Sequence, residues 1–239
     1  PGKIFASDFD LGIMGEAYYD AGSEANYGGD FSAWNNGWAY RNDNVDIQNN
    51  EDPLSNGYNV GWIESDEWMQ YTLKDPTSGL YNIKVRVATE DNDGSFYFKI
   101  NDNQVTDLIN VPNTDSWTNW SFINIDSLVV YDTDDKFVFQ VKTGTFNLGF
   151  FEFERIGDIN LLQTKYISSF TLSENSININ FNKNLDNTST LNKSDFILNI
   201  NDQEKDIQNV NYSSSPRSII INFDTEIQPT DIITISYTG

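Results

Sequence analysis

The chain has 239 residues, and its 36 acidic residues against 14 basic ones give a formal net charge of −22. This charge argues against a nucleic-acid partner, because binding to phosphates requires a basic surface. The sequence contains neither Cys nor His, which excludes thiolate nucleophiles, Cys/His zinc sites and Ser-His-Asp triads and leaves carboxylates, Lys and Tyr for any catalysis.

The composition indicates a folded chain without a membrane anchor. Hydrophobic residues make up 38% of the chain and aromatic residues 14%, which is enough to form a core. No run of about 18 apolar residues occurs, so no membrane-spanning helix is expected. The N-terminal residues Pro1-Gly2-Lys3-Ile4 lack the pattern of a signal peptide, and we interpret the chain as a piece of a longer one.

Short runs of alternating apolar and polar residues follow one another along the chain, and each run predicts a half-buried strand. The dipeptide Asp93-Gly94, directly before one of these runs, is typical of a β-hairpin turn. The runs cover residues 68–72, 82–87, 95–100, 136–141, 149–155, 176–181, 195–200, 218–223 and 231–237.

A shift in composition predicts two domains. All six Trp lie at or before Trp120, and Gly157 is followed by no further Gly until Gly239. We therefore place a boundary near Gly157-Asp158, which gives domains 1–157 and 158–239. Because no long amphipathic helix is visible, the fold class is predicted to be all-β, with two antiparallel β-sandwiches, the second of them the size of one immunoglobulin-like module.

Acidic loops and paired carboxylates are the first candidates for a function. The loops at 42–52, 90–94 and 132–135 are rich in Asp, Asn and Glu, so each is either a solvated turn or a calcium site, although none matches an EF-hand. Paired carboxylates could instead hydrolyse a glycosidic bond. The candidates for such a pair are Asp8 with Asp10, or two of Glu64, Asp66 and Glu67.

The Trp content points to a different kind of site. Sugar rings have apolar C–H faces and polar edges, so a glycan site needs exposed aromatic rings flanked by amides or carboxylates. Six Trp supply such rings, although packing in the core is the ordinary role of any single Trp.

The first domain also carries a series of short blocks in a distinctive order. They include Phe9-Asp10-Leu11-Gly12, Gly15-Glu16-Ala17-Tyr18-Tyr19-Asp20, Val45-Asp46-Ile47, Asn59-Val60-Gly61-Trp62, Asp66-Glu67-Trp68, Trp117-Thr118-Asn119-Trp120 and Phe146-Asn147-Leu148-Gly149. In content and order these blocks closely resemble carbohydrate-binding modules of family 6, and the resemblance covers nearly all of residues 1–157.

The resemblance implies a jelly-roll-like β-sandwich with a glycan cleft in the loops at one edge, where a sugar lies between two aromatic rings. In the family, the first ring ends the Asn-Val-Gly-aromatic block, which is Trp62 here, and the second begins the Trp-x-x-Trp block, which is Trp117. The amide that binds sugar hydroxyls falls on Asn147. A polar position that is often Glu falls on Gln48, and this departure affects which sugar is accepted.

Other Trp residues have alternative roles under the same resemblance. Some family members bind a second glycan on the concave sheet face through the residue that is Trp68 here, although packing is the more ordinary role. We expect Trp120 to point into the core. Trp34 and Trp38, in a Gly- and Asn-rich stretch, either form a wall of the cleft or hold their loop in place.

The resemblance also bears on metal binding. Family members place acidic or amide ligands of a structural calcium at alternate positions of the first strand, but this chain has Phe5 and Ser7 there. Phe cannot ligate calcium and Ser is a weak ligand, so we expect no required cofactor. Residues 158–239 more loosely resemble the immunoglobulin-like spacers of secreted polysaccharide hydrolases. Such modules often continue beyond the point that corresponds to Tyr237-Thr238-Gly239, so the resemblance implies a truncated module.

The leading hypothesis is a non-catalytic module of a secreted bacterial glycoside hydrolase. It would bind a polysaccharide or oligosaccharide and keep the catalytic domain of the parent chain on its substrate, with β-glucan or xylan favoured. We expect an extracellular monomer with no nucleic-acid or membrane partner. The alternatives are a glycosidase that uses the carboxylates above, and a surface interaction module without a sugar site.

Overall fold

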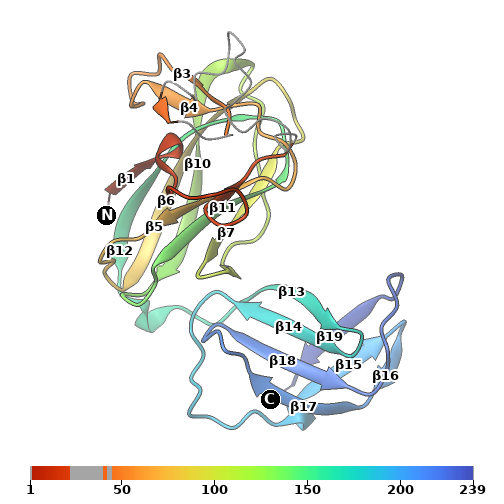
Figure 1. Ribbon diagram of the computed structural model, residues 1–239. Coiled ribbons are helices and arrows are strands. Elements are labelled where there is room, and N and C mark those ends of the chain that lie inside the picture. Colours follow the sequence, from red (N-terminus) through yellow and green to blue (C-terminus); the bar gives the residue numbers. More distant parts are fainter. Residues whose placement is uncertain (1, 22–39, 42–44, 239) are drawn as a thin grey trace. The chain divides into compact units, whose positions relative to one another are not determined.

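The computed structural model describes residues 2–21, 40–41 and 45–238, and it is nearly all β-structure, which confirms the predicted fold class. The chain divides into two compact units (Figure 1). The first consists of Pro1–Asp102 and Thr106–Leu161, and the second of Asn103–Val105 and Leu162–Gly239. No helix in the described part of the chain has the length and apolar character needed to cross a bilayer.

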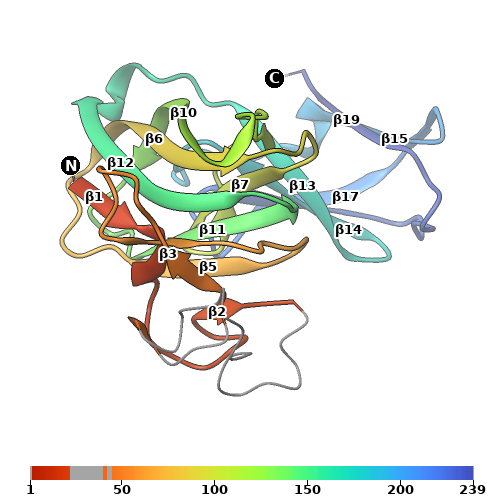
Figure 2. The ribbon, with the colours of Figure 1, turned by 90° about the horizontal axis from the view of Figure 1, so that it is seen from above.

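The first unit is a sandwich of two antiparallel sheets. In Figure 2, strands β6, β10 and β12 run in one layer, and β5 and β11 run in the other. The β6 sheet has the order β10-β6-β12-β4-β3, with β1 added to β12, and the β11 sheet contains β2-β5-β11-β7, with β9 added to β7. The bounds are β1 Gly2–Phe5, β3 Ile47–Asn49, β4 Tyr58–Val60, β6 Gly79–Thr89, β10 Ser116–Val130 and β12 Asn147–Gly157 for the first sheet, and β2 Tyr18–Tyr19, β5 Trp68–Thr72, β7 Ser95–Ile100, β9 Ile109–Asn110 and β11 Lys136–Thr143 for the second.

Phenylalanine rings from both sheets form the core of this unit. On β7 the side chains of Phe96, Phe98 and Ile100 are buried and alternate with less buried ones, as expected of a strand with one buried face. The rings of Phe98 and Phe137 lie 4.7 Å apart, and each meets Phe151 of the opposite sheet edge-on, at 5.7 and 5.3 Å. These three side chains are fully buried, so aromatic packing between the layers fixes the positions of the strand ends from which the loops emerge.

One local prediction is wrong. The Asp93-Gly94 turn was expected to close a hairpin, but β6 pairs with β10 and β12, while β7 pairs with β11 and β9. The segment between β6 and β7 therefore crosses from one layer to the other. A hairpin turn and a crossover between layers share the same turn-forming residues, and the strand pairing that distinguishes them depends on distant partners.

The second unit is a smaller sandwich with its own core. Ile and Leu side chains of β14, β15 and β18 form one buried cluster, which includes the fully buried Leu198 and Ile221. A short 3-10 turn, Lys193–Asp195, precedes β15, and another, Ile159–Leu161 at the end of the first unit, precedes β13. One sheet has the order β13-β14-β18-β17 (Tyr166–Ser173, Ser176–Phe181, Ser218–Phe223, Ile207–Tyr212), and the other β16-β15-β19 (Gln203–Lys205, Phe196–Ile200, Ile233–Tyr237).

A pair of buried carboxyl groups lies inside the first unit, next to β5. Asp20 is 6% and Glu67 is 7% exposed, and the Ala21 amide donates a hydrogen bond to Glu67 Oε1 at 3.1 Å. Burial and the neighbouring Asp20 carboxylate raise the pKa of Glu67 to about 9, because both disfavour the charged form. The two groups therefore share a proton at neutral pH.

This pair makes the stability of the first unit depend on pH. The ordinary pKa of Glu67 is 4.5 and the folded value is about 9, so the contribution of the neutral acid is complete below pH 4.5 and is lost as the pH rises towards 9. We expect the free energy of unfolding to fall over this interval by at most about 1.4 kcal/mol per pH unit. Denaturant unfolding at several pH values, followed by Trp fluorescence, measures it, because all six Trp precede residue 121.

The Glu67→Gln variant is the matched control, because an amide of the same shape has no proton to lose. Its free energy of unfolding is expected to vary less with pH. Between pH 5 and pH 9 the stability of the variant relative to the native chain should therefore increase. Parallel curves for the two proteins would show that Glu67 is charged in the folded unit.

Candidate functional site

The hairpin of β3 and β4 positions two of the predicted site residues. Gln48 on β3 is paired with Asn59 on β4, and its Nε2 donates to Asn59 Oδ1 at 3.3 Å. Directly after β4, Trp62 takes a left-handed backbone conformation with φ of +48°, which is unfavourable for a residue with a side chain. The Trp62 side chain is 46% exposed, and backbone strain of this kind is typical of a functional position.

The second Trp and the amide come from two other strands. Trp117 near the start of β10 is 36% exposed. Asn147 begins β12, is 4% exposed, and donates from Nδ2 to the Trp117 carbonyl at 2.8 Å. This bond fixes the amide and turns its Oδ1 towards Gly61, where an added Cβ would lie only 3.0 Å from that oxygen. Glycine at position 61 therefore gives the amide room.

All four residues line one pocket of about 400 Å³. Its walls are Gln48, Trp62, Asp91, Trp117, Thr145, Phe146 and Asn147. Among the described residues, neither Trp62 nor Trp117 packs its ring against another aromatic ring or against the other Trp. The pocket thus offers two open indole surfaces together with amide, hydroxyl and carboxylate groups, a combination suited to a ligand with apolar faces and polar edges.

Sequence reasoning missed Asp91 and Thr145 as pocket residues. Asp91 belongs to the acidic loop at 90–94, which the sequence offered only as a solvated turn or a cation site. Thr145 directly precedes the Phe146-Asn147 block, and its hydroxyl donates to Asp91 Oδ2. Residues 91 and 145 come from different loops, so no spacing in the sequence indicates that they meet.

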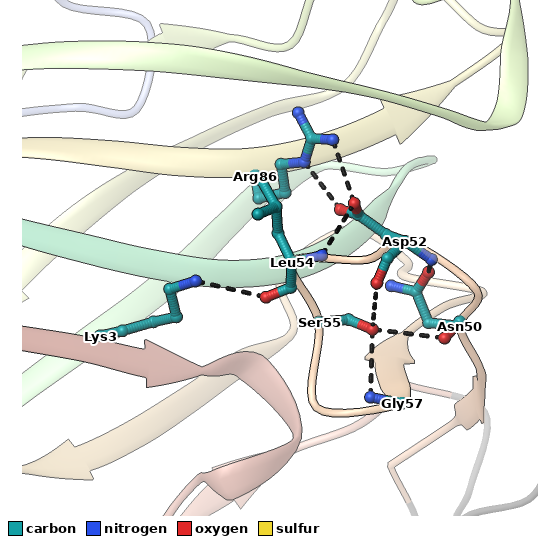
Figure 3. Close-up of polar contacts among 7 residues, drawn as sticks. All are labelled: Lys3, Asn50, Asp52, Leu54, Ser55, Gly57 and Arg86. Carbon is teal, nitrogen blue, oxygen red and sulfur yellow. Dashed lines mark hydrogen bonds and ion pairs between the residues drawn. The ribbon is translucent and has the colours of Figure 1, made fainter.

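A polar loop at residues 50–57 holds the β3–β4 hairpin in place (Figure 3). Ser55 Oγ donates to the Asp52 carbonyl at 2.8 Å and accepts from the Gly57 amide at 3.0 Å. Asp52 forms an ion pair with Arg86 of β6, with 2.8 Å between Oδ2 and Nε and side-chain exposures of 2% and 14%. Burial has the largest single effect and raises the pKa of Asp52, but the hydrogen bonds from Arg86 and the Leu54 amide and the positive charge of Arg86 together outweigh it, so the pKa of Asp52 is lowered.

The remaining Trp residues lie elsewhere. Trp68 on β5 is half-buried on the outer face of the β11 sheet, next to Tyr19 and Gln140 in the pairing register, and does not line the pocket. A second glycan site there stays a prediction. Trp120 is half-buried rather than in the core, because its ring lies beside Gly149 on the outer face of the β6 sheet. Trp34 and Trp38 fall outside the described residues.

The carboxylates considered for catalysis have other partners. Asp8 accepts a hydrogen bond from Tyr40, and Asp10 Oδ2 accepts from Gln70 and Thr72 at 2.9 Å. Asp66 forms an exposed ion pair, and Glu67 is buried with Asp20. None of these acids, nor Glu64, lines the pocket that contains Trp62 and Trp117.

Phe5 and Ser7, which the resemblance aligns with calcium ligands, have side chains that are unsuited to a calcium ion. The Phe5 ring packs edge-on against Phe150, with 6.1 Å between centroids, and Ser7 is fully buried with its Oγ accepting from Asn56 at 3.0 Å. In the described part of the chain, no three acidic side chains come together as metal ligands. The acidic stretch 42–52 is described only from residue 45 onwards.

Comparisons with known proteins place this geometry in context. Residues 39–155 match the family model described as carbohydrate binding module, family 6. Over 121 residues the chain is 28% identical to the clotting factor G alpha subunit of Tachypleus tridentatus, a match that spans 50% of this chain and 16% of that protein.

Several solved structures are also similar. The C-terminal family 6 module of LamC, a marine laminarinase from Zobellia galactanivorans, is 26% identical with a TM-score of 0.42, covering 46% of this chain and 88% of that one. The module CBM6cm-2 from Cellvibrio mixtus lichenase 5A, in complex with cellotriose, is 25% identical with a TM-score of 0.42, covering 47% and 87%. A β-1,3-glucan binding module from Bacillus halodurans is 18% identical with a TM-score of 0.45, covering 64% and 94%.

Proposed function

Because residues 39–155 match the family model of carbohydrate-binding modules of family 6, a family that is not catalytic, we propose that this chain anchors a secreted bacterial glycoside hydrolase on its polysaccharide. The observation that carries the proposal is the pocket with Trp62 and Trp117 exposed in its wall and Asn147 and Gln48 beside them. A β-linked glycan, either β-glucan or xylan, is the ligand that we favour.

Each group in the pocket has a distinct task in this proposal. The two indole rings stack on the apolar faces of a sugar, and this stacking provides most of the affinity. By analogy with the stacking of nucleic-acid bases on aromatic rings, each ring contributes about 1–3 kcal/mol to the binding free energy. The amides of Asn147 and Gln48 hydrogen-bond to hydroxyl groups and select the orientation. Exposed rings in a small pocket support a dissociation constant in the micromolar to millimolar range.

Weak binding of this kind suits an anchor. A catalytic domain joined to the module meets the polysaccharide at a high effective concentration, so even a modest affinity keeps it on the substrate. The second unit, in this proposal, is an immunoglobulin-like spacer between the module and other parts of the parent protein. We further propose that glycan binding needs no metal ion, since Phe5 and Ser7 are unsuitable ligands.

Titration calorimetry of the full chain tests the proposal. The panel contains soluble β-1,3- and β-1,4-glucans, xylan and agaro-oligosaccharides, each with and without chelator. Saturable heat with one β-linked class, unchanged by chelator, is expected. If the folded chain gives no heat of binding with any glycan in the panel, an interaction module without a sugar site is favoured. If the chain alone releases reducing ends from a glycan, a glycosidase is favoured.

A further inference from the structure

Asp91 is the only charged residue among the described residues that line the Trp62–Trp117 pocket. We propose that Asp91 determines specificity there: its carboxylate accepts hydrogen bonds from sugar hydroxyls and repels acidic sugars, so that the pocket takes neutral glycans and rejects uronate-bearing ones. This inference rests on the proposed function, because it concerns the class of glycan that the same pocket binds.

The carboxylate is held in place by a network of threonines. Thr145 donates its hydroxyl hydrogen to Asp91 Oδ2, and Thr89 Oγ1 accepts from the Asp91 amide at 3.0 Å while donating to the Thr145 carbonyl at 2.9 Å. Thr89 is buried at the end of β6. Both the backbone and one carboxylate oxygen of Asp91 are therefore fixed before a ligand arrives. Within the described part of the chain, the second oxygen is left to accept a hydrogen bond.

The same network reaches the loop that leads into β10 and Trp117. Thr114 is 6% exposed, and its Oγ1 accepts from the Thr89 amide at 2.8 Å and donates to the Thr89 carbonyl at 3.0 Å. A nearby amide, Asn113, donates to the carbonyl of Glu90. The position of the carboxylate is thus tied to that of an aromatic ring, which is the arrangement needed to read hydroxyl positions on a stacked sugar.

Within the described lining of the pocket, no cation compensates the charge of Asp91. The described lining residues include no Lys or Arg. In the adjoining groove, which shares Gln48, the sole base among the described lining residues is Arg86, and it is paired with Asp52. Residues 1–157 contain 26 acidic against 9 basic residues. An anionic sugar would therefore enter an uncompensated negative field.

A hydroxyl group has the opposite effect on the same carboxylate. Hydrogen bonds from a neutral donor to an ionised acceptor are stronger than those between neutral groups, so a fixed carboxylate adds affinity for a neutral sugar. One residue then produces both attraction and rejection, which is how specificity against a close competitor is commonly obtained.

The test compares matched ligands on the full chain by calorimetry. Neutral gluco- or xylo-oligosaccharides are set against the same backbones carrying uronates, namely gluco-oligosaccharides oxidised at C6 and glucuronosyl xylo-oligosaccharides. In about 20 mM salt the neutral ligand should bind at least about tenfold more tightly than the uronate ligand. In about 0.5 M salt this difference in affinity should be smaller, because salt screens the repulsion between charges near solvent. This arm needs no variant.

The Asp91→Asn variant, nearly isosteric, supplies the second arm. This variant should lose about three- to tenfold in affinity for the neutral ligand. It should also reduce the difference in affinity between neutral and uronate ligands and weaken the dependence of that difference on salt. The matched control is Asp93→Asn in the same loop, because Asp93 is exposed and does not line the pocket; it should leave this difference within about twofold of its original size.

The outcomes separate the two proposals. If the neutral glycan binds but neither Asp91→Asn nor salt changes the difference in affinity between neutral and uronate ligands, the proposed role of Asp91 is wrong. The proposed anchor function is then unaffected. Preference of the native chain for the uronate ligand likewise overturns it. Binding of neither ligand by the native chain overturns the proposed function, and this inference with it.

Discussion

Replacing either Trp62 or Trp117 by Ala is expected to weaken glycan binding by about 10–100-fold, which at micromolar to millimolar affinity removes retention on an insoluble polysaccharide. Both rings are exposed in the pocket wall, and neither packs against another aromatic ring among the residues that the structure describes. Replacing either ring therefore removes a surface on which the ligand stacks, but it removes little packing from the core. Affinity electrophoresis in gels containing the polysaccharide, followed by calorimetry, measures the loss.

The backbone of Trp62 provides a way to separate folding from binding. Because its φ of +48° is unfavourable for any residue with a Cβ atom, Trp62→Gly should be more stable than Trp62→Ala by about 1 kcal/mol, yet bind no better.

The variant Trp68→Ala tests for a binding site on the outer sheet face. If Trp68→Ala abolishes binding while Trp62→Ala and Trp117→Ala do not, the ligand lies on that face and the pocket assignment is wrong.

Breaking the ion pair between Asp52 and Arg86 is expected to be the most damaging change to stability. The Asp52→Asn variant leaves a partly buried guanidinium without its counter-charge, and such a loss costs about 3 kcal/mol. It also releases the loop that holds the β3–β4 hairpin, and with it Gln48, from β6. Denaturant unfolding followed by Trp fluorescence measures the change in free energy.

The chain contains a matched surface pair as a control. Lys142 and Asp66 lie 4.0 Å apart with 59% and 75% exposed side chains, so Asp66→Asn should change stability by less than about 0.5 kcal/mol. A double variant, Asp52→Leu with Arg86→Met, should recover much of the loss, since no charge is then left unpaired. Equal effects of Asp52→Asn and Asp66→Asn would show that the buried pair contributes nothing special.

Local patterns in the sequence were sufficient to predict several strands. The alternation at 95–100, 176–181 and 218–223 predicts β7, β14 and β18 with the bounds that the structure has, because period-two alternation directly encodes one buried face. The four residues of the pocket came from the resemblance to a family. Spacing alone could not bring positions 48, 62, 117 and 147 together, since their proximity depends on the pairing of distant strands.

Features that depend on tertiary contacts could not be predicted. The Asp93-Gly94 turn connects two layers instead of two paired strands, and Trp120 lies on the outer face of its sheet. The irregular register of β10 against β6 between Ser116 and Ser121 changes which side chains face inward, and a simple count of alternation from Trp117 does not include it. Asp91 joins the pocket through a threonine network that spans three loops.

The walls of the pocket come from segments that begin near residue 48 and end near residue 147, so it exists only when nearly the whole first unit is folded. A glycan that binds there binds the native state and not the unfolded chain. By mass action, glycan at about a hundred times its dissociation constant adds about 2.7 kcal/mol to the free energy of unfolding. Under the proposed function, the polysaccharide would therefore stabilise the folded state of the module that binds it, and would protect that module from proteolysis most where polysaccharide is abundant.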